Sequence, residues 1–227
     1  MQPGPHATPQ RRYIFVGPTL HRGLAAKLRF ELDDFVVLPP AKRGDMQRLL
    51  GSPPGMVVIV DGYFHLHNLA VGHAELRHAI EAGWQVWGVS SMGAIRAAEM
   101  RELGMRGFGR VYQHYVDDPT FRDDEVALLH EPEPPYRTFS EPLVHVRAWL
   151  AAMVEAHALP ADRWAELIET LMPMWFGERT PALLASLVGP ELAGWMDRLD
   201  EFQLKSRDLA EFLDARPWLG TIEATEA

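Results

Sequence analysis

Residues 88–99 read GVSSMGAIRAAE, and they place a strand-to-helix turn near the middle of the chain. The largely apolar residues 84–87 before the turn are typical of a short buried strand. Good helix formers follow the turn as far as Leu103, where Gly104 predicts the end of a helix. In parallel α/β sheets such turns lie at the carboxyl edge, where the first free N–H groups of the helix face the crevice. The stretch therefore predicts a nucleophile or an anion site at this turn.

Three further units of the same kind precede this turn. Each is a β-rich run followed by residues with helical spacing: 13–16 with 20–30, 35–38 with 45–50, and 56–60 with 69–82. The run at 56–60 is uniformly apolar, as a strand covered on both faces by helices should be. The alternation predicts an α/β fold with a three-layer parallel sheet of the Rossmann or flavodoxin-like kind.

The pattern also divides the chain into regions. Residues 1–10 are rich in Pro and Gly and predict a flexible leader, whereas residues 11–138 form the predicted α/β core. Residues 139–220 show helical patterning throughout and predict a C-terminal all-helical appendage. Residues 221–227 are expected to form an acidic tail.

Composition excludes several classes of function. The 227 residues are 47% hydrophobic, which is enough for a full core, and the formal charge of -9 argues against a nucleic-acid partner. No apolar run approaches the ~20 residues of a membrane helix, and the N-terminus lacks the apolar core of a signal peptide, so we expect a cytoplasmic protein. The absence of cysteine excludes disulfides, thiolate metal sites, cysteine nucleophiles and a persulfide carried on the protein.

The two serines of the turn have a structural and a chemical interpretation. A serine before a helix is most often an N-cap, worth about 1 kcal/mol of helix stability. Two adjacent serines allow Ser90 to cap the helix while Ser91 projects into the crevice as a nucleophile or as a direct substrate ligand. The match to the G-x-S-x-G motif is imperfect, because one extra residue separates Gly88 from Gly93.

Other polar residues are candidates for the same crevice. Arg96 and Glu99 are three residues apart on one predicted helix, and they form either an exposed pair or a site in which Arg96 binds an anionic substrate or holds the loop acids. His73 begins the helix that follows Asp61, so it is the preferred general base, and His130 is the second choice.

We predict no metal site. His65 and His67, together with His73, superficially resemble a metal cluster, but no carboxylate completes the set at a recognised spacing. Asp124 and Glu125 belong to an acidic loop of a kind that is usually solvated, although the apolar residues directly after them would draw both carboxylates inward.

These residues resemble the TfuA-like family. The resemblance covers about the first two-thirds of the chain, and its most specific part is Ser-Met-Gly-Ala-x-Arg-Ala-Ala-Glu at 91–99. Two departures are Gly72, where a bulky aromatic residue is common, and His145, where an asparagine is usual. The other matching residues are Gly17-Pro18-Thr19, Asp61-Gly62, His73-x-Glu75, Gly104-Met105, Asp123-Asp124-Glu125-Val126-Ala127, His130 and Arg147.

The resemblance implies a function in sulfur delivery. A TfuA-like protein is expected to act with a YcaO enzyme, which uses ATP to activate a peptide amide for thioamidation of the backbone. The TfuA-like partner would supply sulfur by cleaving a thiocarboxylated, ubiquitin-fold sulfur carrier to release sulfide, with the precursor peptide as a further possible partner. The lack of cysteine fits this scheme, because the chain cannot relay a persulfide itself. We expect no cofactor.

In this scheme Ser91 attacks the thiocarboxylate and expels hydrosulfide. The N–H groups of Met92 and Gly93 stabilise the oxyanion, with Gly17 or Gly62 completing the hole. The remaining residues are expected to position substrate and base: Arg96 on the anionic thiocarboxylate, His73 as base oriented by Asp61 or Glu75, and Glu99, Asp124, Glu125 and His130 in contact with substrate.

Two other functions stay open from the sequence. The protein is alternatively a docking or allosteric partner of YcaO without catalysis of its own, in which the crevice only grips the carrier tail. A stand-alone serine esterase is the third interpretation, and it requires turnover of simple thioesters without any partner. Nothing in the sequence indicates a lipid or small-acyl pocket for that activity.

Overall fold

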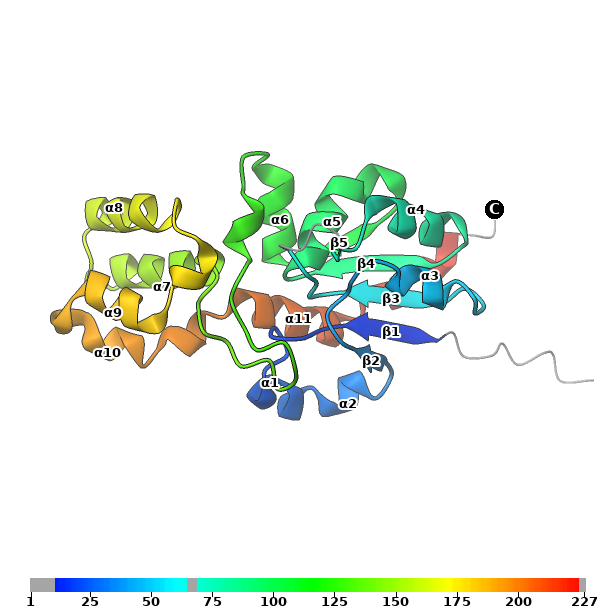
Figure 1. The fold of residues 1–227 in the computed structure, drawn as a ribbon, viewed down its shortest axis with the longest axis horizontal. Coiled ribbons are helices and arrows are strands. Elements are labelled where there is room, and N and C mark those ends of the chain that lie inside the picture. The colour runs from blue at the N-terminus through cyan, green and yellow to red at the C-terminus, as the bar shows by residue number, and fades with distance from the viewer. Residues whose placement is uncertain (1–10, 65–68, 225–227) are drawn as a thin grey trace, which may run out of the picture.

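The computed structural model describes residues 11–64 and 69–224, in which five parallel strands form one sheet (Figure 1). The sheet order is β2-β1-β3-β4-β5, so the predicted α/β fold with a parallel sheet is confirmed. Both β2 and β3 are neighbours of β1, which places the topological switch point between β1 and β3. The strands are β1 (Arg12–Phe15), β2 (Val36–Leu38), β3 (Met56–Ile59), β4 (Gln85–Val89) and β5 (Arg106–Phe108).

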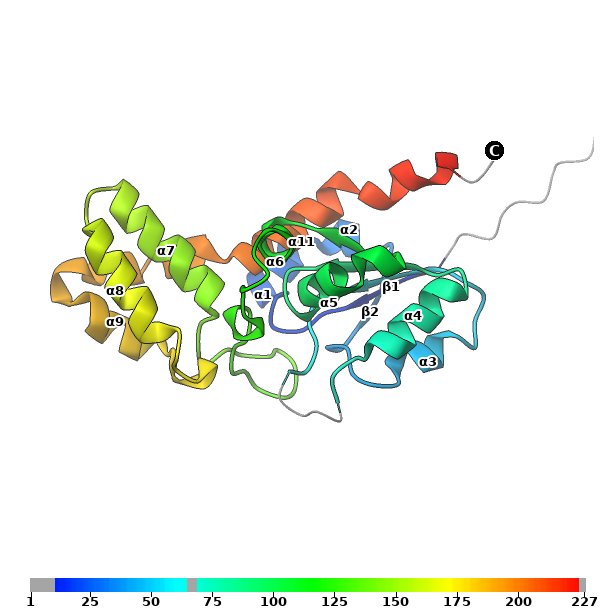
Figure 2. The same ribbon diagram turned by 90° about the horizontal axis from the view of Figure 1, so that it is seen from above.

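Helices cover both faces of this sheet (Figure 2). Alternate residues of a strand point to opposite faces, so Val57 and Ile59 of β3 pack in one core cluster and Met56 and Val58 pack in the other. One face carries α3 (Asp45–Leu49), α4 (His73–Glu81) and α5 (Met92–Met100), and the other carries α1 (Arg22–Lys27), α2 (Arg29–Leu32) and α11 (Leu204–Ala215).

The C-terminal helices separate into two groups. One group packs around the buried Trp149 and lies beyond the carboxyl ends of the strands (Figure 1): α7 (Leu143–Glu155), α8 (Ala161–Leu171), α9 (Pro181–Val188) and α10 (Ala193–Met196). In contrast, α11 returns to the sheet, where Phe212 and Trp218 join the core cluster of β1 and β3. Within residues 139–220, which the sequence predicts to form an all-helical appendage, α7 to α10 pack together, whereas α11 packs on the sheet and completes its three layers.

Shorter elements connect these helices. The α6 helix (Arg110–Asp117) follows β5 and packs on α5. The 3-10 helices are η1 (Arg101–Leu103), η2 (Asp123–Glu125), η3 (Phe176–Glu178), η4 (Pro190–Leu192), η5 (Leu199–Phe202) and η6 (Pro217–Ala224). The expected leader at 1–10 lies outside the described residues, as do 225–227 of the expected tail.

Within the described ranges, no helix combines the length and apolarity needed to cross a bilayer. The same part of the chain contains no group of three or more histidine, aspartate or glutamate side chains arranged to hold a metal ion. The sequence analysis compared His65, His67 and His73 with a metal cluster. Of these, His65 and His67 lie outside the described residues.

Asp208 joins α11 to the start of α6. Its carboxylate accepts the N–H groups of Arg110 at 3.0 Å and Val111 at 2.8 Å. Asp208, which lies on a distant helix, therefore caps the N-terminus of α6. The Asp208 side chain is fully buried, and burial raises its pKa to about 6 against the opposing effect of the two N–H groups.

This raised pKa predicts a pH dependence of stability. A carboxyl group that binds its proton more tightly when folded stabilises the fold at low pH, and that contribution is lost as pH rises from about 4 to above 6. The rise of about two pKa units corresponds to about 3 kcal/mol. Urea unfolding measures the free energy of unfolding of the wild type and of Asp208→Asn at several pH values. From pH 4 to pH 7, this free energy should fall by about 3 kcal/mol more in the wild type than in the variant. Parallel pH curves would contradict the prediction.

Candidate functional site

The serine turn has an unusual backbone conformation. The Ser91 N–H donates to the Val89 carbonyl at 2.7 Å, which makes Ser90 the centre of a γ-turn with φ at 67°. This form of the γ-turn is rare and strained for a residue other than glycine. The Ser90 hydroxyl donates to the backbone carbonyl of Lys205 at 2.8 Å, so Ser90 anchors the turn to α11 instead of capping α5.

Ser91 stands at the N-cap position of α5, yet its hydroxyl caps nothing. The residue is 2% exposed, and no hydrogen-bond partner for its Oγ lies within the described residues. The Met92 N–H likewise finds no acceptor in the described part of the chain, whereas the Gly93 N–H donates to the Val60 carbonyl at 3.2 Å. Gly93 is required for this close approach, because a Cβ there would overlap the Ile59 carbonyl.

Asp61 lies at the switch point and ties the end of β3 to the end of β1. Its carboxylate accepts the Gly17 N–H at 2.8 Å, the Thr19 N–H at 3.0 Å and the Thr19 hydroxyl at 2.7 Å. The Gly17 amide is therefore committed to Asp61. The Gly62 N–H has no acceptor among the described residues. The Gly62 backbone packs against the Met92 side chain, so the N–H groups of Gly62 and Met92, neither of which has an acceptor in the described residues, lie at the same carboxyl edge of the sheet.

His73 lies in a separate cluster. Its Nε2 is 2.8 Å from Glu99 Oε2, and Arg96 Nη1 donates to the same oxygen at 2.6 Å. Arg96 Nε also donates to the Val71 carbonyl at 3.0 Å, so Arg96 holds α5 against the segment before α4. The structure brings His73, Arg96 and Glu99 together, and the imidazole partner is Glu99.

The expected orienting residues of His73 have other partners. Asp61 binds the β1 turn as described above, and Glu75 accepts the N–H groups of Gly72 and Gly44, both at 2.9 Å. Glu75 is therefore a capping residue at the start of α4.

Glu99 also lines an acidic cavity of about 240 Å³ between α5 and α6, with Tyr115, Asp118 and Asp123. Burial and the Glu99 carboxylate raise the pKa of Asp123, and burial raises the pKa of Tyr115. An anionic substrate would be repelled here.

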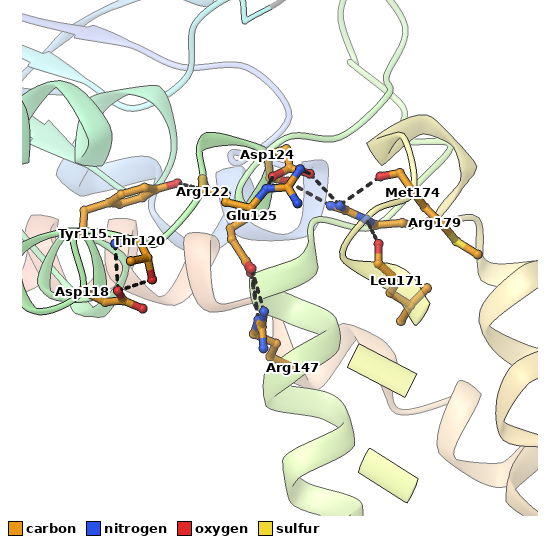
Figure 3. A network of polar contacts seen from close by, with 10 residues as sticks. All are labelled: Tyr115, Asp118, Thr120, Arg122, Asp124, Glu125, Arg147, Leu171, Met174 and Arg179. Atoms are coloured by element: carbon orange, nitrogen blue, oxygen red, sulfur yellow. Dashed lines mark hydrogen bonds and ion pairs between the residues drawn. The ribbon is translucent and has the colours of Figure 1, made fainter. Parts of the chain in front are cut away.

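The acidic loop binds the appendage (Figure 3). Glu125 is 3% exposed and pairs with Arg147 of α7, with contacts of 2.8 and 3.0 Å. Asp124 Oδ2 accepts from Nη2 of Arg179 at 2.8 Å, and Arg179 is fully buried. These carboxylates thus have cationic partners that fix α7 and η3 to the core.

His130 lies in the loop between η2 and α7. Its Nδ1 is 2.6 Å from the Glu131 carbonyl, and its ring lies edge-on to Tyr136. Tyr136 reaches the end of β1, where a Cβ on Gly17 would be 3.6 Å from the tyrosine ring. A cavity of about 360 Å³, lined by Pro18, Tyr136, Asp200 and other residues, opens beside this turn.

Lys205 is the residue at the site that sequence patterns do not reveal. It lies in the first turn of α11 and is 2% exposed, with Nζ donating to the Val126 carbonyl at 2.9 Å. Burial lowers its pKa, against the attraction of the carboxylates of Asp61 and Glu141. An isolated lysine 115 residues from Ser90 carries no local signal of this placement.

His145 is the neighbour of Lys205 on α7. Its Nε2 accepts the Lys205 N–H at 3.3 Å, and its Nδ1 is 3.5 Å from Glu141 Oε2. Burial lowers the pKa of His145, which favours the neutral ring that this accepting nitrogen requires.

The chain was compared with known families and proteins. A family model described as TfuA-like protein matches residues 61–180, a segment that begins at Asp61, includes the serine turn and the acidic loop, and ends before Lys205. A comparison with curated proteins gave no match. Because the matched segment spans more than half of the sequence, the chain belongs to the TfuA-like family.

Proposed function

We propose that this protein hydrolyses the thiocarboxylated C-terminus of a ubiquitin-fold sulfur carrier, and that the sulfide released serves a YcaO enzyme in backbone thioamidation of a ribosomal peptide. Family membership supports the partnership. The observation that carries the hydrolysis is the Ser91 hydroxyl at the N-cap of α5, which has no hydrogen-bond partner among the described residues. It lies beside the Met92 N–H, which has no acceptor among them either.

The chemistry requires an oxyanion site next to the nucleophile. Ser91 Oγ attacks the thiocarboxylate carbon, and negative charge develops on the oxygen of that carbon. The Met92 N–H points from the positive end of α5, and the Gly62 N–H is the second donor that we assign to the hole. Gly17 and Gly93 do not contribute, because their amides are already bonded.

The remaining family residues hold this turn in place. Asp61 fixes the end of β1, and Arg96 with Glu99 fixes α5, so we assign these three residues to positioning. The carrier tail would enter through the cavity beside Pro18 and Tyr136. Since Ser91 is 2% exposed, the residues that cover it must shift when the tail binds.

Sulfide release by the purified protein tests this function. Incubation with a thiocarboxylated carrier, without YcaO, should yield one sulfide and one carboxylated carrier per turnover, measured by a sulfide probe and by the intact mass of the carrier. A carrier with an ordinary C-terminal carboxylate is the matched control and should yield none. Absence of release above the uncatalysed rate would contradict the proposal.

The burial of Ser91 favours a second candidate function, in which the protein only docks the carrier on YcaO. In that case the protein alone releases no sulfide, but it accelerates thioamidation by YcaO even when free sulfide is supplied. A thioamidation assay at saturating sulfide, with and without the protein, distinguishes the two.

A further inference from the structure

We infer that the protein has a second ligand site, apart from the serine turn, that binds a phosphate monoester with a flat ring, such as a nucleoside monophosphate. The site is a cavity of about 290 Å³ walled by α6, α7, α8 and α11. Among the described residues, those that line it include none from the serine turn at 88–93. The inference therefore goes beyond the proposed function.

Three guanidinium groups surround this cavity. Arg110 begins α6, Arg147 lies on α7, and Arg207 lies on α11. No carboxylate of the described residues joins them in the lining, although the whole chain has a formal charge of -9. Like charges gathered around one space repel each other, so an anion bound among them would relieve that repulsion.

Glu125 holds Arg147 in a fixed orientation (Figure 3). Glu125 Oε2 accepts from Arg147 Nε at 3.0 Å, and Oε1 accepts from Nη2 at 2.8 Å. The Arg147 Nη1 has no acceptor in the described part of the chain. Its N–H groups are therefore left for a ligand oxygen, on a side chain that is already ordered before the ligand binds.

Arg110 and Arg207 form no ion pair with any of the described residues. The Asp208 carboxylate attracts Arg110, but both of its oxygens are bonded to backbone N–H groups. Arg207 Nη2 donates to the backbone carbonyl of Glu201 at 3.2 Å, which is a neutral acceptor. Both arginines are exposed, so their side chains can contact a ligand at the rim of the cavity.

The charge balance selects the class of anion. With His114 counted as neutral, the three arginines of the lining carry three positive charges, and Glu125 offsets one of them through its pair with Arg147. A phosphate monoester carries about -1.5 to -2 near neutral pH, which matches the two charges that remain. A single carboxylate would leave one guanidinium uncompensated, and a triphosphate would bring more negative charge than the cavity offsets.

The rest of the lining is apolar and contains three aromatic rings. Phe121 lies in the loop after α6, Trp164 on α8 and Phe202 in η5, and Val144 and Leu204 add aliphatic surface. A flat ring stacks favourably on aromatic side chains and on the planes of arginine side chains. A ligand with a phosphate group and a ring therefore matches both halves of the cavity.

The size of the cavity favours a free monophosphate over a polymer. Its volume of about 290 Å³ lies at the lower end of the range for small-molecule sites, which begins at about 300 Å³. The acidic net charge of the chain also disfavours the extended contact with a phosphate backbone that nucleic acids require. Since the ligand would contact α6 and α11 of the core and α7 and α8 of the appendage, its binding should stabilise the packing of the two.

Calorimetric titration of the full chain with adenosine monophosphate tests the site, in the absence of carrier and YcaO. One molecule should bind per chain with a dissociation constant below about 1 mM. Adenosine, which lacks the phosphate, and glycerol 3-phosphate, which lacks the ring, should each bind about 10-fold or more weakly. A single-stranded oligoadenylate without a terminal phosphate distinguishes nucleic acid from free nucleotide and should also bind more weakly.

Two variants locate the site. Arg110→Gln and Arg207→Gln should each weaken adenosine monophosphate by about 10- to 100-fold, because each removes a charge-assisted hydrogen bond to phosphate. Arg163→Gln is the matched control: Arg163 is exposed on α8, pairs with Glu166 at 3.0 Å, and does not line the cavity. The nucleotide should also raise the unfolding temperature of the wild type and of Arg163→Gln, and this rise should be smaller in the other two variants.

Each contrary result overturns a stated part of the inference. Absence of binding at about 1 mM nucleotide overturns the site, and affinity that both arginine variants retain overturns its location. Adenosine or glycerol 3-phosphate that binds as tightly as the nucleotide overturns the ligand class, as does tighter binding of the oligoadenylate. None of these measurements depends on sulfide release, so failure of the proposed function would leave their outcome unchanged.

Discussion

Ser91→Ala should lower sulfide release by about 10³-fold or more, because no other group can form the acyl intermediate once the nucleophile is removed. The variant should keep the wild-type melting temperature, since the Ser91 hydroxyl makes no hydrogen bond to the described residues and its removal breaks no contact of that kind. Sulfide release is measured with the thiocarboxylated carrier in the absence of YcaO, and the unfolding temperature is measured on the same preparation.

Ser90→Ala is the matched control, since it removes a hydroxyl from the adjacent residue. Its expected effect is on stability: the hydrogen bond from Ser90 to the Lys205 carbonyl is lost, at a cost of about 0.5 to 1.5 kcal/mol. The Ser91 nucleophile stays in place, so release stays measurable. Full sulfide release by Ser91→Ala would contradict the assignment of Ser91 as the nucleophile. The assignment would also be contradicted if both variants lost sulfide release equally while Ser90→Ala kept the stability of the wild type.

Arg179→Met should cause the largest loss of stability of any single substitution considered for this protein. The guanidinium is fully buried and donates to the carbonyls of Leu171, Met174 and Asp124 and to the Asp124 carboxylate. Methionine fills part of the volume but donates no hydrogen bond. The Leu171 carbonyl keeps the Met174 N–H and the Asp124 carboxylate keeps Arg122, but all four acceptors lose the donor that Arg179 supplies. Removing one partner of a buried ion pair costs about 3 to 5 kcal/mol, which urea unfolding should detect.

The control for this substitution is Arg77→Met. Arg77 pairs with Glu81 one turn away at 3.4 Å, and both side chains are more than half exposed. Exposed pairs of this kind contribute about 0 to 1 kcal/mol. A loss in Arg179→Met no larger than that in Arg77→Met would mean that the buried cluster does not hold the appendage to the core.

The sequence predicted those elements whose pattern is local. Residues 56–60 are uniformly apolar, and β3 is accordingly the central strand, with every residue at most 1% exposed. The strand-to-helix turn at Ser90 is equally local, because glycine and serine interrupt an apolar run. The strand β5 escaped prediction because its three residues, Arg106–Phe108, contain no apolar run and gain their strand conformation by pairing with β4.

The site could be predicted less completely from the sequence, because its hydrogen-bond partners are far apart in sequence and are brought together only by the fold. The position of His73 after the β3 edge indicated a base, but the nearest carboxylate in space belongs to Glu99, on the next helix. Glu125 lies inward with its charge paired, and Arg147, its partner, was in the family pattern without a stated role. Lys205 could not be found from its neighbours in sequence, which form an ordinary helix start.

The return of α11 to the sheet has a consequence for biosynthesis. The contacts that tie α11 to the carboxyl edge of the sheet join residues made far apart in time: Ser90 with Lys205, 115 residues later, and Thr19 with Ser206, 187 residues later. Such long-range closure is slow relative to local helix formation. A nascent chain can therefore assemble β1 to β5 while it is still being translated, but it cannot anchor the turn until its last helix emerges. In the proposed function, sulfide release would therefore begin only once α11 has packed on the sheet.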